Sequence, residues 1–444
     1  MNHFIQTIKN IWRIEDLRFR ILMTLGLVAI YRIGSYIVLP GIDGAQLQQL
    51  EDEGGKGIFG LVNIFAGGAF TRASIFALGI MPYISASIVM QLLGMAVPAV
   101  QKLQKDESGR RTVNQYTRLL TVVVTALQAS AYVVYIKSLG AQILVSEGLF
   151  WFSTLVVLTA GTVFVMWLGE KITDKGIGNG ISLLIMVGII ARLPFSLAAE
   201  FTSRMSAGGN GGLVAFIFEI AALIAVIMLV ILLVQGTRKI PVQYAKRIVG
   251  NKQYGGVRQY IPLKVNAAGV MPIIFAQALM FIPATVSQFF PDSAASQGAG
   301  MFTDHTSFWY NVIFGLLIVV FTYFYTALIV NPVQMADDMK RNGGFVPGIK
   351  PGKKTADFID GIMSRITLPG SLFLALVAIL PAFAAMFGMI GDFGNFFGGT
   401  SLLIMVGVVL DTLQQIESHL LMRHYDGLMK SGRIKGRTSA ASAY

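Results

Sequence analysis

The sequence predicts an all-α polytopic membrane protein with about ten transmembrane helices in two inverted five-helix halves. Hydrophobic side chains make up 54% of the 444 residues and charged ones 13%, whereas about a quarter of an ordinary soluble domain is charged. The apolar residues form runs of about 20, the length that a helix needs to cross the hydrocarbon core. Basic residues gather between alternate runs, as they do in the cytoplasmic loops of membrane proteins.

Ten apolar runs are long enough to span a bilayer or nearly so. In chain order they cover 18–39, 73–97, 116–136, 150–169, 180–199, 212–235, 265–290, 307–331, 367–388 and 399–421. If the amino terminus is cytoplasmic, 29 of the 35 Lys and Arg fall in the tails and loops on that side. We therefore expect a multi-pass membrane protein with both termini in the cytoplasm.

The ten spans divide into two sets of five, and an odd number of spans inverts the second set relative to the first. We expect an N-terminal half over 1–199, a linker over 200–211, a C-terminal half over 212–421 and a cytoplasmic tail over 422–444. Inverted halves are common in transporters and channels. Prolines or glycines interrupt the second span of each half, at Pro82 in one and at Gly269, Pro272 and Pro283 in the other.

The segment IFGLVNIFAGGAF, residues 58–70, is apolar but too short to cross the membrane, and glycines flank it. Such a segment is either re-entrant or lies on the membrane surface. Irregular backbone at membrane depth is tolerated only inside protein or beside water. The re-entrant interpretation therefore predicts a cavity within the bundle.

Motifs for catalysis, metals and cofactors find no support in the sequence. GIKPGKKT (348–355) differs from a phosphate-binding loop in the spacing of its glycines, and GIGNG (176–180) joins two spans rather than a strand and a helix. The chain has no cysteine, and its four histidines lack metal-ligand spacing. We expect neither an enzyme nor a metal or cofactor.

A secondary solute transporter is the main alternative, because such proteins place ionisable groups in mid-membrane to bind substrates or coupling ions. Here the polar residues deepest in the spans are uncharged, and they lie on the two interrupted spans. They are Ser85, Ser87, Gln91, Asn266 and Gln277. Such residues either join helices permanently or hydrogen-bond across an interface that opens.

Two long loops, 236–264 and 332–366, are predicted to be cytoplasmic. Positive-inside topology explains their basic residues, but it does not require loops of about 30 residues. We therefore expect a docking surface for a large partner, and a membrane-anchored docking scaffold is a further alternative. Its candidate residues are Arg238, Lys239, Lys246, Arg247, Lys252, Arg258, Lys350, Lys353 and Lys354.

Nearly the whole chain resembles the SecY/Sec61-alpha family of protein-conducting channels. The resemblance lies in YRIGSYIVLPGID near the amino terminus, NIFAGGAFTRASIFALGIMPYISASIVMQLL through the second span, and ESGRRTVNQYTR after it. It continues in FVMWLGEKITDKGIGNGISLLI, PVQYAKR, IPLKVNAAGVMPIIFA, NPVQMADDMKRNGGFVPGIKPGKKT and GGTSLLIMVGVVLDT. These blocks occur along this sequence in the same order as in the family.

The resemblance implies an hourglass pore that translocates secretory polypeptides and opens sideways to lipid between the second and seventh spans, at the lateral gate. The segment at about 58–70 would be the plug, with Phe59, Leu61, Val62, Asn63, Ile64 and Phe65. An apolar ring would close the waist of the pore, since a narrow apolar constriction excludes water. The ring positions correspond to Ile80, Ile84, Ile181, Ile185, Ile274 and Ile404.

The resemblance also implies partners and a location. The subunits SecE and SecG, the motor ATPase SecA, the ribosome, nascent chains with signal sequences and membrane lipids would be the partners, in a bacterial plasma membrane. One position departs from the family, which commonly has Arg where this chain has Lys350. Lys keeps the charge but loses the bidentate geometry of Arg.

Overall fold

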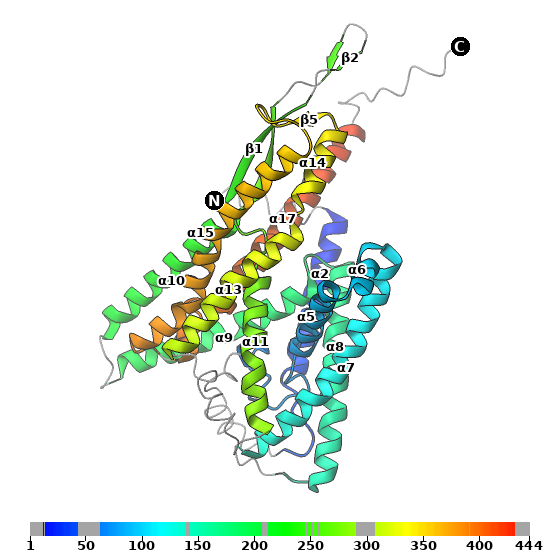
Figure 1. Cartoon of the computed structure of the whole chain (residues 1–444). Helices are drawn as coiled ribbons and strands as arrows, with labels where there is room; N and C mark the ends of the chain where they lie inside the picture. The colour runs from blue at the N-terminus through cyan, green and yellow to red at the C-terminus, as the bar shows by residue number, and fades with distance from the viewer. Residues whose placement is uncertain are drawn as a thin grey trace. The chain divides into compact units, whose positions relative to one another are not determined.

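The computed structural model of the chain describes residues 12, 14–42, 63–138, 143–206, 212–244, 247–249, 252–254, 258–289, 307–389 and 391–430. Helices make up most of the described chain (Figure 1). By their contacts the described residues form two units. The described residues of the first lie within 12–191 and 408–430, and those of the second lie within 192–407.

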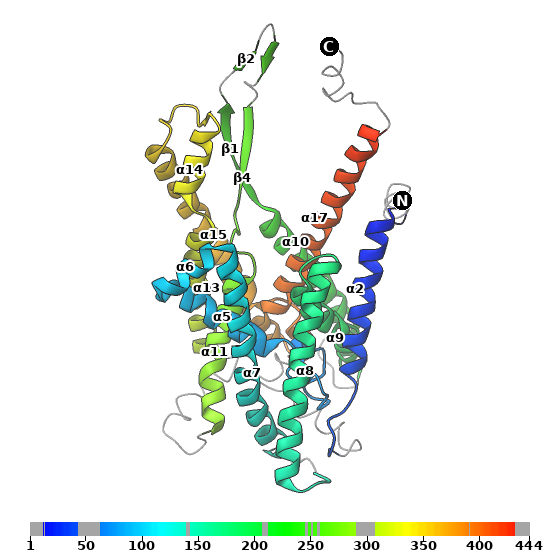
Figure 2. The same ribbon diagram turned by 90° about the vertical axis from the view of Figure 1, so that its right-hand side faces the viewer.

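The first unit is helical. Its helices are α2 (Glu15–Gly34), α5 (Met81–Ala96), α6 (Pro98–Lys105), α7 (Glu107–Ser138), α8 (Glu147–Lys175), the first half of α9 (Gly180–Met205) and most of α17 (Gly399–Lys430). Helix α7 packs against both α5 and α8, and α2 packs against α8, which Figure 2 shows beside it. The unit therefore has α8 between α2 and α7.

The second unit contains the end of α9, the first turns of α17 and the remaining elements. Its other helices are α10 (Gly212–Gln235), α11 (Met271–Phe289), α13 (Phe308–Ile329), α14 (Pro332–Arg341), α15 (Lys353–Met386) and α16 (Gly391–Gly394). Helix α13 packs between α11 and α15 (Figure 1). Both ends of α14 follow the sequence: Asn331 caps its start by accepting hydrogen bonds from the Val333 and Gln334 amides, and Lys340 and Arg341 occupy its last turn.

The predicted loop 236–264 is a β-hairpin rather than an irregular connection. Strands β1 (Thr237–Tyr244) and β4 (Arg258–Lys264) pair in antiparallel register, and β5 (Gly344–Phe345) adds to the other edge of β1. Strands β2 (Arg247–Val249) and β3 (Lys252–Tyr254) pair beyond the ends of β1 and β4 (Figure 2). Apolar side chains alternate along β1, and the buried ones pack on α14 and α15.

The helices agree with the predicted spans, because each of the ten predicted ranges overlaps one helix. Among the described residues, seven helical stretches are long and apolar enough to cross a membrane, and Met81–Gly94 and Met271–Met280 are shorter apolar helices. Helix α2 meets neither description, and Glu15, Asp16, Arg18 and Arg20 lie in its first six residues. The mostly helical fold with several apolar spans is thus confirmed.

Two helices begin later than predicted. The span expected from residue 73 becomes helical at Met81, and the span expected from residue 265 becomes helical at Met271. Turns precede both helices, and Gly79 and Gly269 have positive φ angles of 53° and 63°, which end helical geometry. In contrast, α9 continues to Met205, so it includes the first residues of the predicted linker.

Candidate functional site

The predicted plug is described in its second part, since Phe59, Leu61 and Val62 lie outside the described residues. Asn63, Ile64 and Phe65 form a helical turn that is 2–7% exposed. The Asn63 side chain accepts hydrogen bonds from the amide and the hydroxyl of Thr71, at 3.2 and 3.1 Å. The Gly68 amide donates to the Asn63 carbonyl at 2.8 Å. Residues 63–71 are therefore closed on themselves by hydrogen bonds.

Four of the six predicted ring residues belong to the first unit. Ile80 is 5% exposed and directly precedes α5, and Ile84 lies one turn later, with its amide donating to the Ile80 carbonyl at 3.1 Å. Ile181 and Ile185 lie in the first two turns of α9, where the Asn179 side chain caps the helix. Residues four apart on a helix share a face, so each pair forms one apolar strip.

The loop before α9 is fixed by side chains from two other helices of the first unit. The Thr24 hydroxyl on α2 accepts from the Ile177 amide at 3.1 Å, and Gln415 on α17 accepts from the Gly178 amide at 2.9 Å. These bonds satisfy backbone groups that the turn leaves unpaired. They also fix where α9 begins, and therefore where Ile181 and Ile185 lie.

The other two predicted ring residues, Ile274 and Ile404, belong to the second unit. Ile404 is 3% exposed on α17, and Ile274 lies in the first turn of α11. The start of α11 repeats the start of α5, because GVMPII (269–274) corresponds to GIMPYI (79–84). This repeat aligns Ile274 with Ile84 and Val270 with Ile80. Sequence reasoning noted the prolines but missed the repeat, although comparison of the two helix starts would have found it.

The predicted lateral-gate residues differ in how their polar atoms are satisfied. The Ser85 hydroxyl donates to the Met81 carbonyl within α5 at 3.2 Å, and the Gln91 amide donates to the Ser87 hydroxyl at 3.4 Å. In the second unit, Asn266 is 6% exposed and its side-chain oxygen has no hydrogen-bond partner among the described residues. A buried carbonyl oxygen without a partner destabilises the state that contains it.

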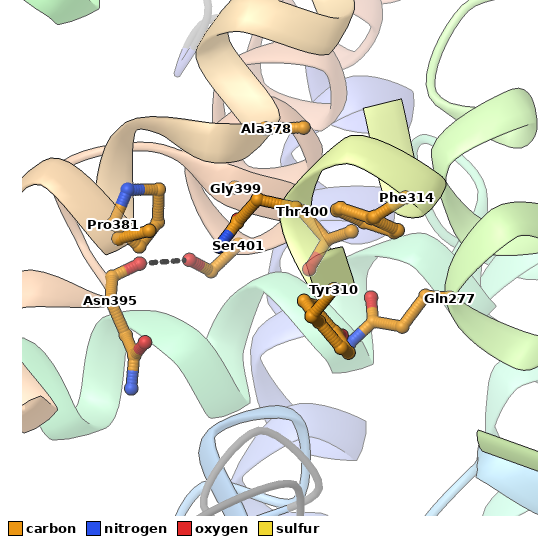
Figure 3. A pocket seen from close by; sticks show the side chains of 11 residues that line it. Gln277, Tyr310, Phe314, Ala378, Pro381, Asn395, Gly399, Thr400 and Ser401 are labelled. Carbon is orange, nitrogen blue, oxygen red and sulfur yellow. Dashed lines mark hydrogen bonds between the residues drawn. The ribbon is translucent and has the colours of Figure 1, made fainter. Parts of the chain in front are cut away.

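Gln277, the fifth of these residues, lines a cavity of about 40 Å³ within the second unit, and both polar and apolar side chains border it (Figure 3). Its other lining side chains include Tyr310, Thr400 and Ser401, and the Ser401 hydroxyl donates to the Asn395 carbonyl at 2.8 Å. The volume is sufficient for one to a few water molecules. The lining residues are uncharged, so the cavity offers hydrogen bonds without fixing a charge.

The predicted docking residues lie on and beside the sheet of the second unit. Arg238, Lys239 and Arg258 are exposed on β1 and β4, and Lys350, Lys353 and Lys354 are exposed between β5 and the first turn of α15. Arg247 and Lys252 lie on β2 and β3, and Lys246 lies outside the described residues. The buried side chains of Ile240, Val242 and Leu263 anchor the sheet in the core of the second unit. The basic groups thus project from a packed platform.

Comparisons with known proteins agree over nearly the whole chain. A family model described as SecY matches residues 74–413. A protein translocase subunit SecY of Streptomyces galbus is 45% identical over 439 residues, which cover 94% of this chain and 98% of the relative. The protein of the same name in Thermus thermophilus is 43% identical over 432 residues, which cover 96% and 98%.

Solved structures share the fold at lower identity. A structure of a protein conducting channel has a TM-score of 0.64 at 18% identity, covering 96% of this chain and 95% of its own. A second, concerned with the plug domain of SecY stabilising the closed state and maintaining a membrane seal, has the same values. Sec61 in the canine ribosome-channel complex from the endoplasmic reticulum gives 0.61 at 17% identity, with the same coverage.

Proposed function

Because the chain belongs to the SecY family and is a protein-conducting translocation channel, we propose that the six isoleucines of the predicted ring close the pore around translocating polypeptides. The protein is a multi-pass membrane protein, and its activity is not enzymatic. An apolar constriction excludes water and ions when empty. It also offers a passing chain no hydrogen bond that would hold it in place.

The observation that carries this proposal is the repeated Gly-x-Met-Pro-x-Ile sequence at the starts of α5 and α11. Each copy places an isoleucine in the first turns of the second span of its half. This shared local device supports the assignment of Ile84 and Ile274 to one ring, because inverted repeats place equivalent residues in equivalent positions.

The buried charges favour a channel over a solute transporter. Among the described residues the buried charged side chains are Glu200, Arg204 and Glu219, and they pair with one another. Arg204 contacts both carboxylates, and ions held together in this way at the end of α9 and the start of α10 do not form a mid-membrane substrate or coupling-ion site of the kind that transporters use. The polar groups on α5 and α11 are uncharged instead.

Reconstitution tests the function directly. The full chain with a SecE-type subunit is incorporated into lipid vesicles and supplied with a motor ATPase and a secretory precursor. We expect the precursor to become protease-protected inside, while a labelled small solute stays outside. Accumulation of the solute without entry of the precursor would favour the transporter alternative, and binding of the partner without entry of either would favour a docking scaffold.

We also propose lateral release of apolar segments into lipid between α5 and α11. Ser85, Ser87, Gln91, Asn266 and Gln277 would then hydrogen-bond when the gate is closed and be satisfied by water or by substrate when it opens. The Asn266 oxygen, which has no partner among the described residues, and the cavity at Gln277 support such a dual role. Both provide polar groups whose bonds are not already fixed within one helix.

The orientation follows from the charge bias, and we propose that both termini and the sheet face the cytoplasm of a bacterial cell. The chain has no cysteine, so Gln259→Cys on β4 and Ser146→Cys before α8 each introduce a single cysteine that can be labelled specifically. Both native residues are exposed. In intact cells an impermeant maleimide is expected to label Ser146→Cys and to leave Gln259→Cys unlabelled until the membrane is permeabilised. The opposite pattern would overturn the orientation.

The basic platform would be the docking surface for SecA and for the ribosome, with SecE, SecG and lipids as the membrane partners. Structures of similar fold include the canine ribosome-channel complex. Acidic protein surfaces and RNA phosphates both complement a basic patch, and such complementarity mainly accelerates association. The exposed lysines at 350, 353 and 354 and the arginines on the strands supply that charge.

Lys350→Glu is expected to lower translocation and motor or ribosome affinity by about tenfold, because it reverses one exposed charge of the platform. Affinity is measured with the purified complex, and translocation with vesicles. Lys175→Glu is the matched control, since Lys175 is an exposed lysine at the end of α8, away from the sheet in the sequence. Equal losses in both variants would mean that net charge, rather than this surface, matters.

A further inference from the structure

We propose that Arg32, Gly67 and Gly188 form a latch that holds the plug on the first unit and sets how readily the plug leaves. The inference rests on the proposed role of 58–70 as a plug. The three residues come from three segments of the first unit: the last turn of α2, the turn after Asn63–Phe65, and the third turn of α9. Gly67 belongs to the plug segment, and Arg32 and Gly188 act as positioning residues because they contact that segment.

Arg32 supplies the polar contact of the latch. Its Nη1 donates to the Gly67 carbonyl at 3.2 Å, and its Nη2 donates to the Tyr36 hydroxyl at 3.3 Å. The guanidinium carbon also lies 5.4 Å from the centre of the Tyr36 ring. Tyr36 therefore orients the planar guanidinium on one side while the plug carbonyl binds on the other. A bond from a charged donor is among the stronger hydrogen bonds.

Gly67 and Gly188 supply the steric contact. Gly67 has a φ of 65°, and a β-carbon on it would lie 2.9 Å from the α-carbon of Gly188 and 2.6 Å from Nη1 of Arg32. A β-carbon on Gly188 would lie 2.5 Å from the Phe65 carbonyl oxygen. Both distances to backbone atoms are far below a van der Waals contact, so the two backbones meet with no space for a methyl group. A side chain at either position must push the plug away.

Other hydrogen bonds hold the plug segment on either side of Gly67. Hydrogen bonds between Asn63, Gly68 and Thr71 close it on itself, as described above, and the Tyr132 hydroxyl on α7 donates to the Phe70 carbonyl at 2.6 Å. Gly67 lies between these two attachments. Loss of the Gly67 contact therefore loosens the middle of the segment, whereas its end remains attached at Phe70. Arg32 and Gly188 thus set the equilibrium between the seated and the displaced plug.

A cysteine placed at Ala66 reports the seated plug without reference to transport. Ala66 is 2% exposed, and the chain has no other cysteine. The full chain carrying Ala66→Cys is reconstituted with its SecE-type subunit, and the rate of reaction with a small maleimide is measured. Gly188→Ala and Arg32→Met are each expected to accelerate labelling about tenfold, because the first introduces a clash with the seated plug and the second removes its hydrogen bond to Arg32. Arg32→Lys keeps the charge and is expected to restore part of the protection.

Gly26→Ala is the matched control, because Gly26 lies on α2 with no atom within 4 Å of an added β-carbon. Its labelling rate should equal that of the parent. Unchanged labelling in both Gly188→Ala and Arg32→Met, or equal acceleration in Gly26→Ala, would overturn the latch. Ion conductance of the same vesicles separates the two proposals: faster labelling with a higher conductance supports both, and faster labelling without it supports the latch but refutes the plug as a seal.

Discussion

Replacing Ile404 with Asn is expected to raise the ion conductance of the resting channel about 5- to 150-fold. The side chain of Ile404 is 3% exposed on α17. A buried amide without hydrogen-bond partners costs about 1–3 kcal/mol, and this cost falls on the closed state alone if an open pore is hydrated. The population of open channels should rise by the corresponding factor. Precursors with weak signal sequences should then also cross, because less binding energy is needed to open the pore.

Isoleucine is suited to the closed ring because its side chain is branched at the β-carbon and therefore stiff. A stiff apolar side chain leaves little room for water in a narrow constriction, which then does not conduct ions. Asn removes both properties at once. Ile404→Val keeps the branching and the apolar surface, so it should leave conductance within about twofold of the parent.

Conductance and export of a signal-defective precursor are measured at matched protein abundance. Val409→Asn introduces the same amide on the same helix at a side chain that is 39% exposed, and it should change neither quantity. If Ile404→Asn lowers abundance but leaves conductance and export unchanged, Ile404 packs against a neighbour and does not belong to the gate.

The sequence predicted the helices well because crossing a bilayer imposes a length and a composition that hydropathy detects. It predicted their starts less well. Gly79 and Gly269 adopt positive φ angles just before Met81 and Met271, and hydropathy does not change there. Local backbone geometry, rather than burial, decides these boundaries.

The sheet at 237–264 was predicted as a loop because, among its described residues, only Ile240, Val242 and Leu263 form its buried core. Alternation over so short a stretch is a weak signal beside long apolar spans. The latch was inaccessible for another reason. Arg32, Gly67 and Gly188 are far apart in the sequence, and their contact depends on the close approach of three backbones.

A buried ion cluster in the second unit was not predicted from the sequence either. The Arg204 side chain contacts Glu200 at 2.9 Å and Glu219 at 2.6 Å, and all three side chains are at most 6% exposed. Arg204 also donates to the Gly388 carbonyl at 3.2 Å. One cation therefore joins the end of α9, the start of α10 and the turn after α15.

Arg204→Met is expected to destabilise the protein by about 3–5 kcal/mol, because it leaves two carboxylates buried without a countercharge. The thermal unfolding of the purified channel in detergent measures this effect. Glu219→Gln should cost less, since one Glu219 oxygen already lacks a hydrogen-bond partner among the described residues. Adding Glu200→Gln and Glu219→Gln to Arg204→Met should recover part of the lost stability, because no buried charge then remains.

Arg118→Met is the matched control, because Arg118 contacts Glu170 through two hydrogen bonds of 2.9 Å in a pair that is far more exposed. The two side chains are 50% and 30% exposed, and water replaces much of what such a pair loses. The expected cost is at most about 1 kcal/mol. Burial, rather than the number or length of the hydrogen bonds, should thus determine the difference between the two arginines. Equal destabilisation by both substitutions would show that the Arg204 cluster is hydrated, and it would remove the reason for regarding this cation as the joint between α9, α10 and α15.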